Sequence, residues 1–420
     1  MSLLSKLELP ETKQKILILL LIFLAVLLNQ SSVIGGVNMS FADIFAFIFM
    51  ASLIYYNYKI SVPKLELSYF IFLTFNIILT PLFIVPVIFD YQPDPILIFR
   101  EYIKISALFF YLTLGFNIQK LHQEKTLLKC FSAGVLILSL VSVISSFGGL
   151  GFLRPFIYWG SLRFKGLMND PNYFSVLQLC GLAYYWRITD LNRSLRFTAI
   201  LLIIFSVLDS GSKTGFIVMF LYFSFMFFEY LIKTPINIKK TISLFLLLFI
   251  TPICILFVFS DYFLSVIAEH LPVFNRVIIL LNDLDEGVSG GGSGRAEAWS
   301  IATNLINKSP VLGIGVGTYS SLGRIYYGSG VIAHNTYLQI AVEWGLFFAS
   351  IFLFYLAVKI YEISIKKNCN LSVLIYRDII IILLLGSLAI SLNNARLFWI
   401  SLGVILYKLK PLYNKLANQE

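Results

Sequence analysis

Apolar runs long enough to cross a bilayer recur along the chain from Ile16 to Tyr407, and this feature constrains the fold more than any other. About 20 apolar residues span the ~30 Å hydrocarbon layer as a helix. Only 13% of the residues are charged, far below the roughly 25% of soluble domains. The sequence therefore predicts an all-α polytopic membrane protein, with residues 1–420 forming a single integral membrane domain, and excludes a soluble core with one anchor.

The spacing of the apolar runs predicts about twelve transmembrane helices. They begin near Ile16, Phe41, Leu67, Leu97, Leu127, Tyr173, Phe197, Thr214, Thr241, Asn335, Leu374 and Leu397. The first run follows Lys13 and Lys15, and no Ala-x-Ala-like site comes after it. We therefore expect a retained span rather than a cleaved signal peptide.

The basic residues indicate the orientation of these spans. With both termini in the cytoplasm, roughly two thirds of the 32 Lys and Arg residues fall in cytoplasmic segments, as the positive-inside rule requires. The basic residues that this rule leaves unexplained are Arg100 and Lys104 in the fourth span and, on the outer side, Arg154, Arg163, Lys165, Lys213, Arg276, Arg295, Lys308, Arg324 and Arg396. The net charge of +10 is scattered between apolar runs rather than collected on one face, so we expect membrane lipids, and no nucleic acid, as partners.

Residues 269–333 form the largest outer connection and the only stretch long enough for a small subdomain over the membrane. The flexible run from Ser289 to Gly294 precedes a predicted amphipathic helix from Arg295 to Asn307. We expect this helix to lie on the membrane surface. The four cysteines show no metal-ligand spacing, so neither disulfides nor a metal site are expected.

His334 and Asn335 stand at the outer mouth of the tenth predicted span. An imidazole at this boundary can act as a general base toward a hydroxyl group. The alternative is an interfacial residue that merely caps the helix, and position alone leaves both open.

Two further segments of the outer side could bind a phosphate, one through a cation and one through backbone N–H groups. Arg295 begins a helix, whose N-terminus favours anions, and Glu297 lies in its first turn. The glycine-rich stretch Pro310–Gly317 could approach an anion through backbone N–H groups. Without a strand-turn-helix context, a flexible turn is the better interpretation of that stretch.

The connections around the sixth to eighth spans carry a second set of cations. Arg163 and Lys165 precede Asp170-Pro-Asn172, which is a turn and helix-start signal. Lys213 lies in the hairpin from Asp209 to Gly215, where it either faces a phosphate or pairs with Asp209.

Charged residues also occur inside the fourth predicted span. Arg100 and Lys104 share one helical face, and Glu101 can pair with Lys104 at i,i+3. A structural ion pair is the preferred interpretation, and a part in a binding site is the alternative.

The order of these motifs resembles the O-antigen polymerase/ligase superfamily of bacterial envelope polysaccharide assembly. The resemblance covers roughly Arg163 to Gly345: Arg-x-x-Gly with Asp-Pro-Asn, the Ser-Gly-Ser-Lys hairpin, Gly-Arg-x-Glu-x-Trp with Pro-x-x-Gly-x-Gly, and His-Asn before a half span that ends in glycine. It implies a fold similar to the GT-C class and a metal-independent glycosyltransferase without cofactors. The donor would be a glycan linked to undecaprenyl diphosphate.

The same resemblance implies a bacterial inner-membrane location with a periplasmic active site. It also implies a flippase and a chain-length regulator as partners, and it assigns roles to single residues. His334 would be the catalytic base, and the lipid diphosphate would be bound by Arg163, Arg295, Lys213, Lys165 and Arg324. Asn335, Glu297, Asn172 and Arg100 would support them. The family usually has Arg where this chain has Lys213, which keeps the charge but loses the bidentate fork.

One hydroxyl and one base predict a displacement that inverts the anomeric configuration. Phe348 occupies a place where the ligase pattern has a small residue or tyrosine. We therefore favour a repeat-unit polymerase over an O-antigen ligase, which transfers glycan to lipid A core. A polysaccharide transporter or flippase is a third possibility. Such a protein should concentrate polar residues near the bilayer midplane, whereas most of the unexplained cations of this chain lie on the outer side.

Overall fold

The computed structural model describes residues 10–31, 39–160, 162–233, 295–366 and 369–416. The predicted ninth span near Thr241 and residues 269–294 of the outer connection lie outside this part of the chain. The chain divides into two compact units. Unit 1 combines Met1–Phe131 with Ser293–Glu420, and unit 2 is Ser132–Gly292.

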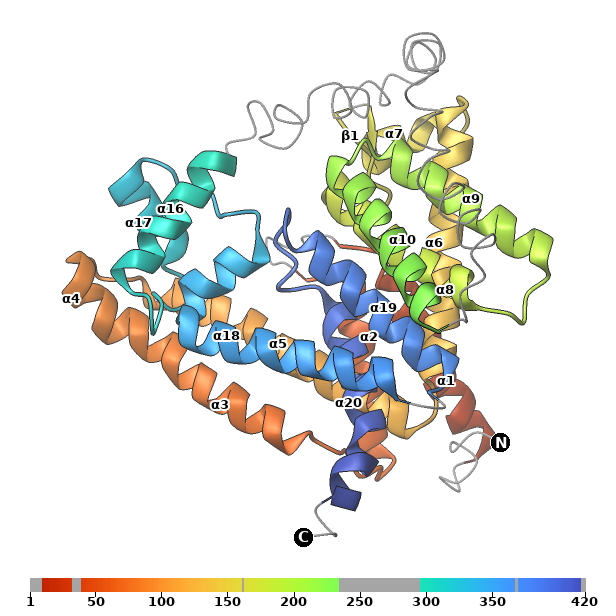
Figure 1. Ribbon diagram of the computed structural model, residues 1–420, viewed down its shortest axis with the longest axis horizontal. Coiled ribbons are helices and arrows are strands. Elements are labelled where there is room, and N and C mark those ends of the chain that lie inside the picture. Colours follow the sequence, from red (N-terminus) through yellow and green to blue (C-terminus); the bar gives the residue numbers. More distant parts are fainter. Residues whose placement is uncertain (1–9, 32–38, 161, 234–294, 367–368, 417–420) are drawn as a thin grey trace. The chain divides into compact units, whose positions relative to one another are not determined.

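Unit 1 is built from helices of both ends of the chain (Figure 1). They are α1 (Glu11–Leu27), α2 (Phe41–Tyr55), α3 (Lys64–Leu79), α4 (Val85–Phe89), α5 (Pro95–Lys120), the first part of α6 (Glu124–Ser146), α16 (Arg295–Lys308), α17 (Tyr319–Tyr327), α18 (Thr336–Ile365), α19 (Leu371–Gly386) and α20 (Arg396–Leu416). A π-helical turn, η2 (Thr80–Ile84), joins α3 to α4 around Pro81.

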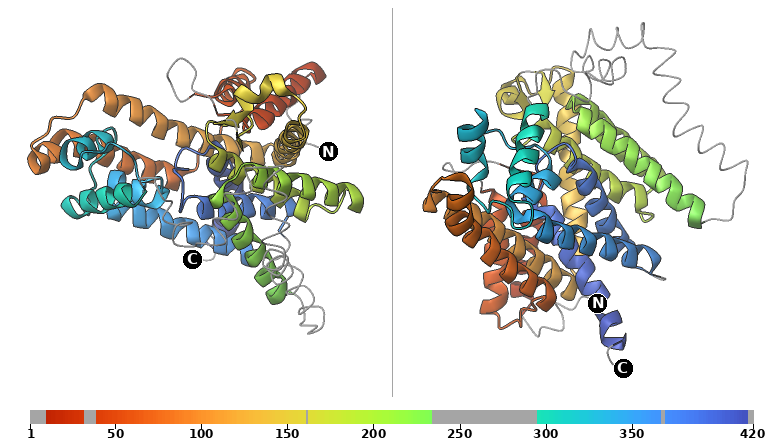
Figure 2. Two further views of the ribbon diagram at one scale, coloured as in Figure 1. Left: turned by 90° about the horizontal axis from the view of Figure 1, so that it is seen from above. Right: turned by 60° about the vertical axis from the view of Figure 1, so that its left-hand side comes forward.

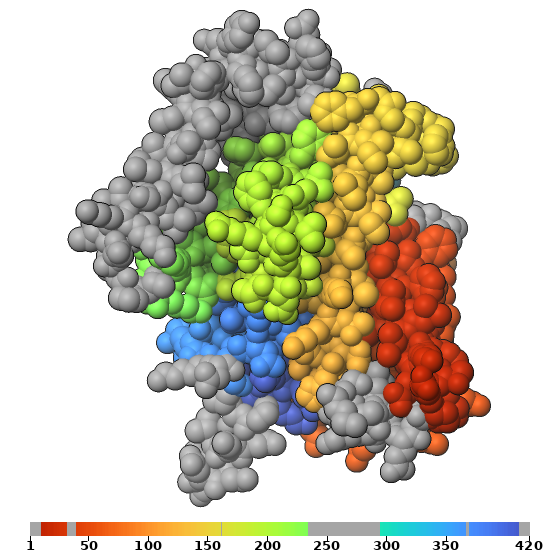
Figure 3. Space-filling view, turned by 90° about the vertical axis from the view of Figure 1, so that its right-hand side faces the viewer, coloured from red at the N-terminus to blue at the C-terminus, as the bar shows by residue number. Residues whose placement is uncertain are grey.

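Unit 2 contains the remainder of α6 and the chain that follows it. Its elements are η3 (Gly151–Leu153), α7 (Arg154–Ile157), β1 (Tyr158–Trp159), β2 (Arg163–Phe164), α8 (Pro171–Arg187), α9 (Arg193–Asp209) and α10 (Lys213–Lys233). The two strands pair antiparallel, with Tyr158 opposite Phe164 and Trp159 opposite Arg163. Buried polar contacts join α6 to α9, which lie side by side in Figure 3: the Ser139 and Ser206 hydroxyl oxygens are 3.2 Å apart.

The helices confirm the predicted class of an all-α membrane protein. Every predicted span start within the described residues falls in a helix or at its N-cap. Among the helices of this part of the chain, four are long and apolar enough to cross a membrane: Lys64–Phe89, Glu124–Ser146, Lys213–Lys233 and Thr336–Ile365. The total of twelve spans and the similarity to the GT-C class stay predictions.

Small residues bring α5 and α20 into close contact. A Cβ atom added to Gly115 would lie 2.1 Å from the Ile400 carbonyl oxygen, and one added to Gly403 would lie 2.1 Å from the Leu112 carbonyl oxygen. Side chains at either glycine would therefore separate the two backbones. Contacts of this kind are typical of helix packing in membranes, where small residues permit dispersion contacts between backbones.

A break in α18 shapes the region of His334. Gly345 has φ 79° and ψ 159°, a backbone conformation that is essentially restricted to glycine. The break frees the carbonyl groups of Val342 and Glu343, which accept hydrogen bonds from the backbone N–H groups of Ile314 (2.8 Å) and Gly315 (3.0 Å). The loop between α16 and α17 thus replaces the missing helical hydrogen bonds, which bilayer lipid cannot do.

The same loop accepts a hydrogen bond from the backbone after the break, and α3 donates to carbonyl groups of the loop and of α18. Leu346 N–H donates to the Pro310 carbonyl (2.8 Å), and the Asn76 amide of α3 donates to the carbonyls of Leu312 and Trp344, both at 3.0 Å. Figures 1 and 2 show α16 and α17 beside each other near the start of α18. The first segment of α18, Thr336 to Trp344, is therefore a half helix held in place by a structured loop.

Candidate functional site

His334 lies in a turn immediately before α18, with an exposed side chain and a left-handed backbone at φ 46°. Its neighbours are buried: Ala333 is 0% and Asn335 is 8% exposed. Left-handed backbone is uncommon outside glycine, and histidine, asparagine and aspartate are the residues that adopt it most readily. The turn therefore presents the imidazole outward while both adjacent residues anchor it.

Asn335, rather than His334, caps the helix. Its side-chain oxygen accepts hydrogen bonds from the backbone N–H groups of Tyr337 (3.0 Å) and Leu338 (3.2 Å), and its amide donates to the Leu388 carbonyl (3.0 Å). This is the standard N-cap arrangement. A capping role for His334 is therefore wrong, and Asn335 supports the turn instead.

The segment between α19 and α20 holds the turn from the other side. The Thr336 hydroxyl donates to the Ile390 carbonyl (3.0 Å) and accepts from the Leu392 backbone N–H (2.8 Å), while Thr336 N–H donates to the Ser387 carbonyl (2.9 Å). The position of His334 is therefore set by hydrogen bonds to parts of unit 1 that are distant in sequence.

Helix α16 brings Arg295 to the same region. Trp299, one turn after Arg295, donates a hydrogen bond from its indole nitrogen to the Ala333 carbonyl at 2.8 Å. Arg295 is half-buried in the first turn of α16 and Glu297 is exposed. Unit 1 therefore joins the helix start that carries Arg295 to the turn that carries His334. Trp299 was not a predicted site residue, although it belongs to the motif behind the resemblance.

The apolar face of α16 is buried inside unit 1. Ile301, Ala302 and Leu305 are at most 3% exposed, and they pack in a cluster with residues of α4, α17 and α18. The expectation that this helix lies on the membrane surface is therefore wrong, because protein covers its apolar face. Burial raises the pKa of the Tyr319 phenol in this cluster to about 12, and the negative charge of the Glu343 carboxylate adds to this effect. The phenol therefore stays protonated and donates to the Ala298 carbonyl (3.4 Å).

The glycine-rich loop packs closely and is not a flexible turn, so that expectation is wrong. Gly313, Gly315 and Gly317 all have positive φ, and a Cβ atom at any of them would lie within 2.8 Å of an atom of another element. The N–H of Gly315 is taken by Glu343. The glycines therefore serve the close approach of the loop to α3, α5 and α18.

Arg324 lies in α17 with an exposed side chain. Its guanidinium packs near Gly330, and it takes part in no ion pair within the described residues.

Arg100 of α5 lies in the same unit. The pairing expected around it is confirmed, since Lys104 contacts Glu101 at 2.7 Å and Arg100 lies 3.8 Å from Glu101.

In unit 2, Arg163 connects three predicted motifs. Its Nε donates to the Ser210 carbonyl of the α9–α10 hairpin (3.0 Å), and its terminal nitrogen donates to the Asn172 side-chain oxygen (3.0 Å). The same Asn172 oxygen accepts from the Ser212 hydroxyl (3.0 Å). Asp170 caps α8, because its carboxylate accepts from the N–H groups of Asn172 and Tyr173. Turn formation thus explains Asp170, while Asn172 orients the guanidinium.

Lys213 and Lys165 are the other cations of unit 2. Asp209 accepts from the Ser142 hydroxyl (2.6 Å), and Lys213 forms no ion pair with it among the residues that the structure describes. The pairing alternative for Lys213 is therefore wrong. Burial lowers the pKa of the half-buried Lys165 ammonium from its usual value, so a bound anion would favour its charged form.

The predicted site residues thus fall into two groups. Unit 1 holds His334, Asn335, Arg295, Glu297, Arg324 and Arg100, and unit 2 holds Arg163, Lys165, Asn172 and Lys213. Within the described ranges, no group of three His, Cys, Asp or Glu side chains has the geometry to hold a metal ion.

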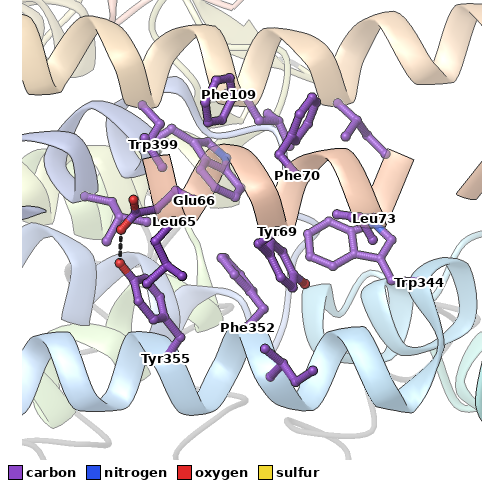
Figure 4. Close-up of a pocket in the computed structure, with 15 residues that line it drawn as sticks. Leu65, Glu66, Tyr69, Phe70, Leu73, Phe109, Trp344, Phe352, Tyr355 and Trp399 are labelled. Carbon is purple, nitrogen blue, oxygen red and sulfur yellow. Dashed lines mark hydrogen bonds between the residues drawn. The ribbon is translucent and has the colours of Figure 1, made fainter. Parts of the chain in front are cut away.

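An apolar cavity of about 180 Å³ also lies in unit 1, between α3, α5, α18 and α20. Figure 4 shows Trp344 at one end and Tyr355 at the other, where the tyrosine hydroxyl donates to Glu66. The Tyr69 hydroxyl is bonded to the Phe348 carbonyl at 2.8 Å. The cavity has the chemistry to hold hydrocarbon, and the Phe348 carbonyl fixes the hydroxyl of its lining residue Tyr69.

The fold and these groups of residues define a polytopic all-α membrane protein with an exposed imidazole beside a helix start that carries arginine. Residues 198–353 match a family model described as O-antigen ligase. The match confirms the resemblance of this part of the chain to the O-antigen polymerase/ligase superfamily. A comparison with curated proteins gave no match.

Proposed function

We propose that this chain is an inverting, metal-independent glycosyltransferase that joins undecaprenyl-diphosphate-linked repeat units on the periplasmic face of the bacterial inner membrane. The observation that carries the proposal is the anchored turn of His334. It exposes an imidazole on a left-handed backbone between two buried residues, and the Trp299 hydrogen bond joins it to the helix that begins with Arg295. The family match supports glycosyl transfer as the reaction class.

In the proposed reaction, His334 takes the proton of an acceptor hydroxyl as its oxygen attacks the anomeric carbon of the donor. The bond from that carbon to the phosphate oxygen breaks, and undecaprenyl diphosphate leaves with the electron pair. Arg295, Arg163 and Lys213 stabilise the negative charge that develops on the diphosphate. Lys165 and Arg324 add to this positive field.

The supporting residues act through position. Asn335 holds the turn of His334, and Asn172 orients the Arg163 guanidinium. Glu297 and Arg100 are proposed as further supports near the outer ends of their helices. One displacement inverts the anomeric configuration, so comparing product with donor by NMR tests this step, and retention would exclude it.

His334→Ala in a polymer-ladder assay tests the assignment of the base. We expect the ladder to disappear while the protein stays at normal abundance in the membrane. His122→Ala is the matched control, because His122 is also exposed and also has a left-handed backbone, at φ 55°. An intact ladder in His334→Ala would remove this residue from the mechanism.

O-antigen ligase is the second candidate, and the description of the matching family model favours it. Phe348 favours the polymerase, as the ligase pattern has a small residue or tyrosine at that place. Complementation separates the two: a polymerase restores long chains in a strain whose core carries one repeat, and a ligase restores transfer in a strain that accumulates lipid-linked polymer. A flippase and a chain-length regulator are the proposed partners.

A further inference from the structure

A groove of about 1190 Å³ lies in unit 1 between α2, α5 and the start of α20. Most of its lining is apolar, and several of these side chains are exposed: Phe47 is 68%, Phe99 is 65% and Ile103 is 51% exposed. In a membrane protein, such side chains face hydrocarbon. The groove is separate from the turn of His334, whose residues do not line it.

Three of the basic residues that the positive-inside rule leaves unexplained line this groove: Arg100, Lys104 and Arg396. Two of them are balanced by carboxylates. Arg396 makes two hydrogen bonds of 2.6 Å to Asp43, and Lys104 contacts Glu101 at 2.7 Å. Arg100 has a side chain that is 57% exposed and lies 3.8 Å from Glu101. The guanidinium of Arg100 is therefore the group with most capacity for an external anion.

The polarity of the groove changes along its length. Arg100 and Lys104 lie near the start of α5, whereas Tyr111, whose hydroxyl donates to Asp43, lies eleven residues beyond Arg100. At 1.5 Å per residue this is about 16 Å along the helix, or about half of a ~30 Å hydrocarbon core. Ile103 and Phe110 of α5 and Phe47 of α2 line the space in between. The groove thus runs from the Arg100 and Lys104 cations over an apolar stretch of the length of a lipid chain in one leaflet, and it ends at Tyr111, Asp43 and Arg396, which are bonded to one another.

We propose that this groove binds the lipid anchor of the glycan acceptor, with its phosphate at Arg100 and Lys104 and its chain between α2 and α5. The assignment to the acceptor rests on the proposed function. A polymerase joins two lipid-linked glycans, and a ligase also transfers to a phosphorylated lipid, so either reaction needs a second amphiphilic site. The five cations proposed to bind the donor diphosphate do not line this groove. Arg100, proposed above as a support, would therefore support the reaction by holding the second lipid.

Photo-crosslinking in cells that make the lipid-linked glycan tests this proposal. The full-length chain carries p-benzoylphenylalanine in place of Phe47, and a control chain carries it in place of Phe354, which is 73% exposed on α18 and does not line the groove. We expect a glycan-bearing adduct at position 47 about tenfold above that at position 354. Equal adducts at both positions, or phospholipid alone at position 47, would overturn the proposal.

A charge variant tests the role of the guanidinium. Arg100→Gln should reduce the adduct at position 47 at least fivefold, because a bidentate contact to phosphate is lost. Arg193→Gln, which removes an exposed arginine at the start of α9 in unit 2, should leave it unchanged. An undiminished adduct in Arg100→Gln contradicts the assignment.

His334→Asn separates this proposal from the proposed function. If the adduct forms and His334→Asn still transfers glycan, the catalytic assignment fails and the groove assignment stands. If transfer depends on His334 and no glycan adduct forms at position 47, the groove assignment alone fails.

Discussion

Replacing Gly345 by alanine should destabilise unit 1 much more than the same replacement at Gly328. Gly345 has φ 79° and ψ 159°, and an added Cβ atom would lie 2.1 Å from the Val311 carbonyl oxygen and 2.5 Å from the Leu312 carbonyl carbon. Gly328 has a similar φ of 73° but ends α17 in the left-handed region, with nothing within 4 Å of its added Cβ atom. The pair therefore separates backbone strain from the steric effect on the break in α18.

The expected free energies follow from this geometry. Alanine at Gly328 costs about 1–2 kcal/mol, as for other residues in left-handed backbone. At Gly345 the strain is about 1–3 kcal/mol. The displaced loop also leaves at least one backbone group of the break without a partner, for about 1–3 kcal/mol more. The total at Gly345 is thus about 2–6 kcal/mol.

Thermal melting of the full-length protein in detergent measures the difference, together with its abundance in membranes. Since 1 kcal/mol shifts Tm by roughly 2–4 °C in a domain of 150–250 residues, Gly345→Ala should lower Tm by about 4–24 °C and reduce abundance. By the same conversion, Gly328→Ala should lower Tm by about 2–8 °C. Equal shifts would refute the inference that the loop at Val311 and Leu312 completes the broken helix.

Three further predictions concern the site. Trp299→Phe should slow transfer on the order of tenfold at normal abundance, because the Ala333 carbonyl loses its hydrogen-bond donor. Trp186→Phe is the control, since the indole N–H of Trp186 has no hydrogen-bond partner among the described residues. Equal rates in the two variants would contradict the inference that Trp299 holds the turn of His334. Arg163→Lys should reduce transfer by a similar factor, since an ammonium cannot donate in the forked geometry that reaches both Ser210 and Asn172; wild-type rates would show that charge alone suffices. Excess EDTA should leave the rate of the purified enzyme unchanged within twofold, and loss of activity that added Mg²⁺ restores would refute metal independence.

Local signals sufficed for the helices and for several caps. The predicted helix from Arg295 to Asn307 compares with α16 at Arg295–Lys308, because its periodicity, acidic first turn and following Pro310 all lie within one segment. The Asp170 cap was predicted from adjacent residues in the same way. The positive-inside rule likewise singles out Arg163 and Arg100 from the sequence alone.

Contacts between distant segments were beyond such signals. The partners of the glycine-rich loop are Val342 and Glu343 of α18 and Asn76 of α3, so the sequence could not distinguish a flexible turn from a packed loop. The apolar face of α16 packs against Val85 and Phe89, more than two hundred residues earlier. Seen without those partners, an amphipathic helix next to membrane spans has the pattern of a surface helix.

The sequence left open whether His334 caps the helix, also for a local reason. His334 and Asn335 are adjacent, and either can accept hydrogen bonds at a helix start. The left-handed backbone at His334 decides between them, because an N-cap residue has an extended backbone, as Asn335 does at φ −146° and ψ 114°.

The most direct measurement of the central claim is the initial rate of glycan transfer by purified full-length protein supplied with lipid-linked repeat units, comparing His334→Asn with His122→Asn. Asparagine tolerates the left-handed backbone at both positions, so the two variants should melt at the wild-type temperature. The account predicts that His334→Asn loses transfer at least a hundredfold while His122→Asn keeps the wild-type rate. Transfer at the wild-type rate by His334→Asn would contradict it.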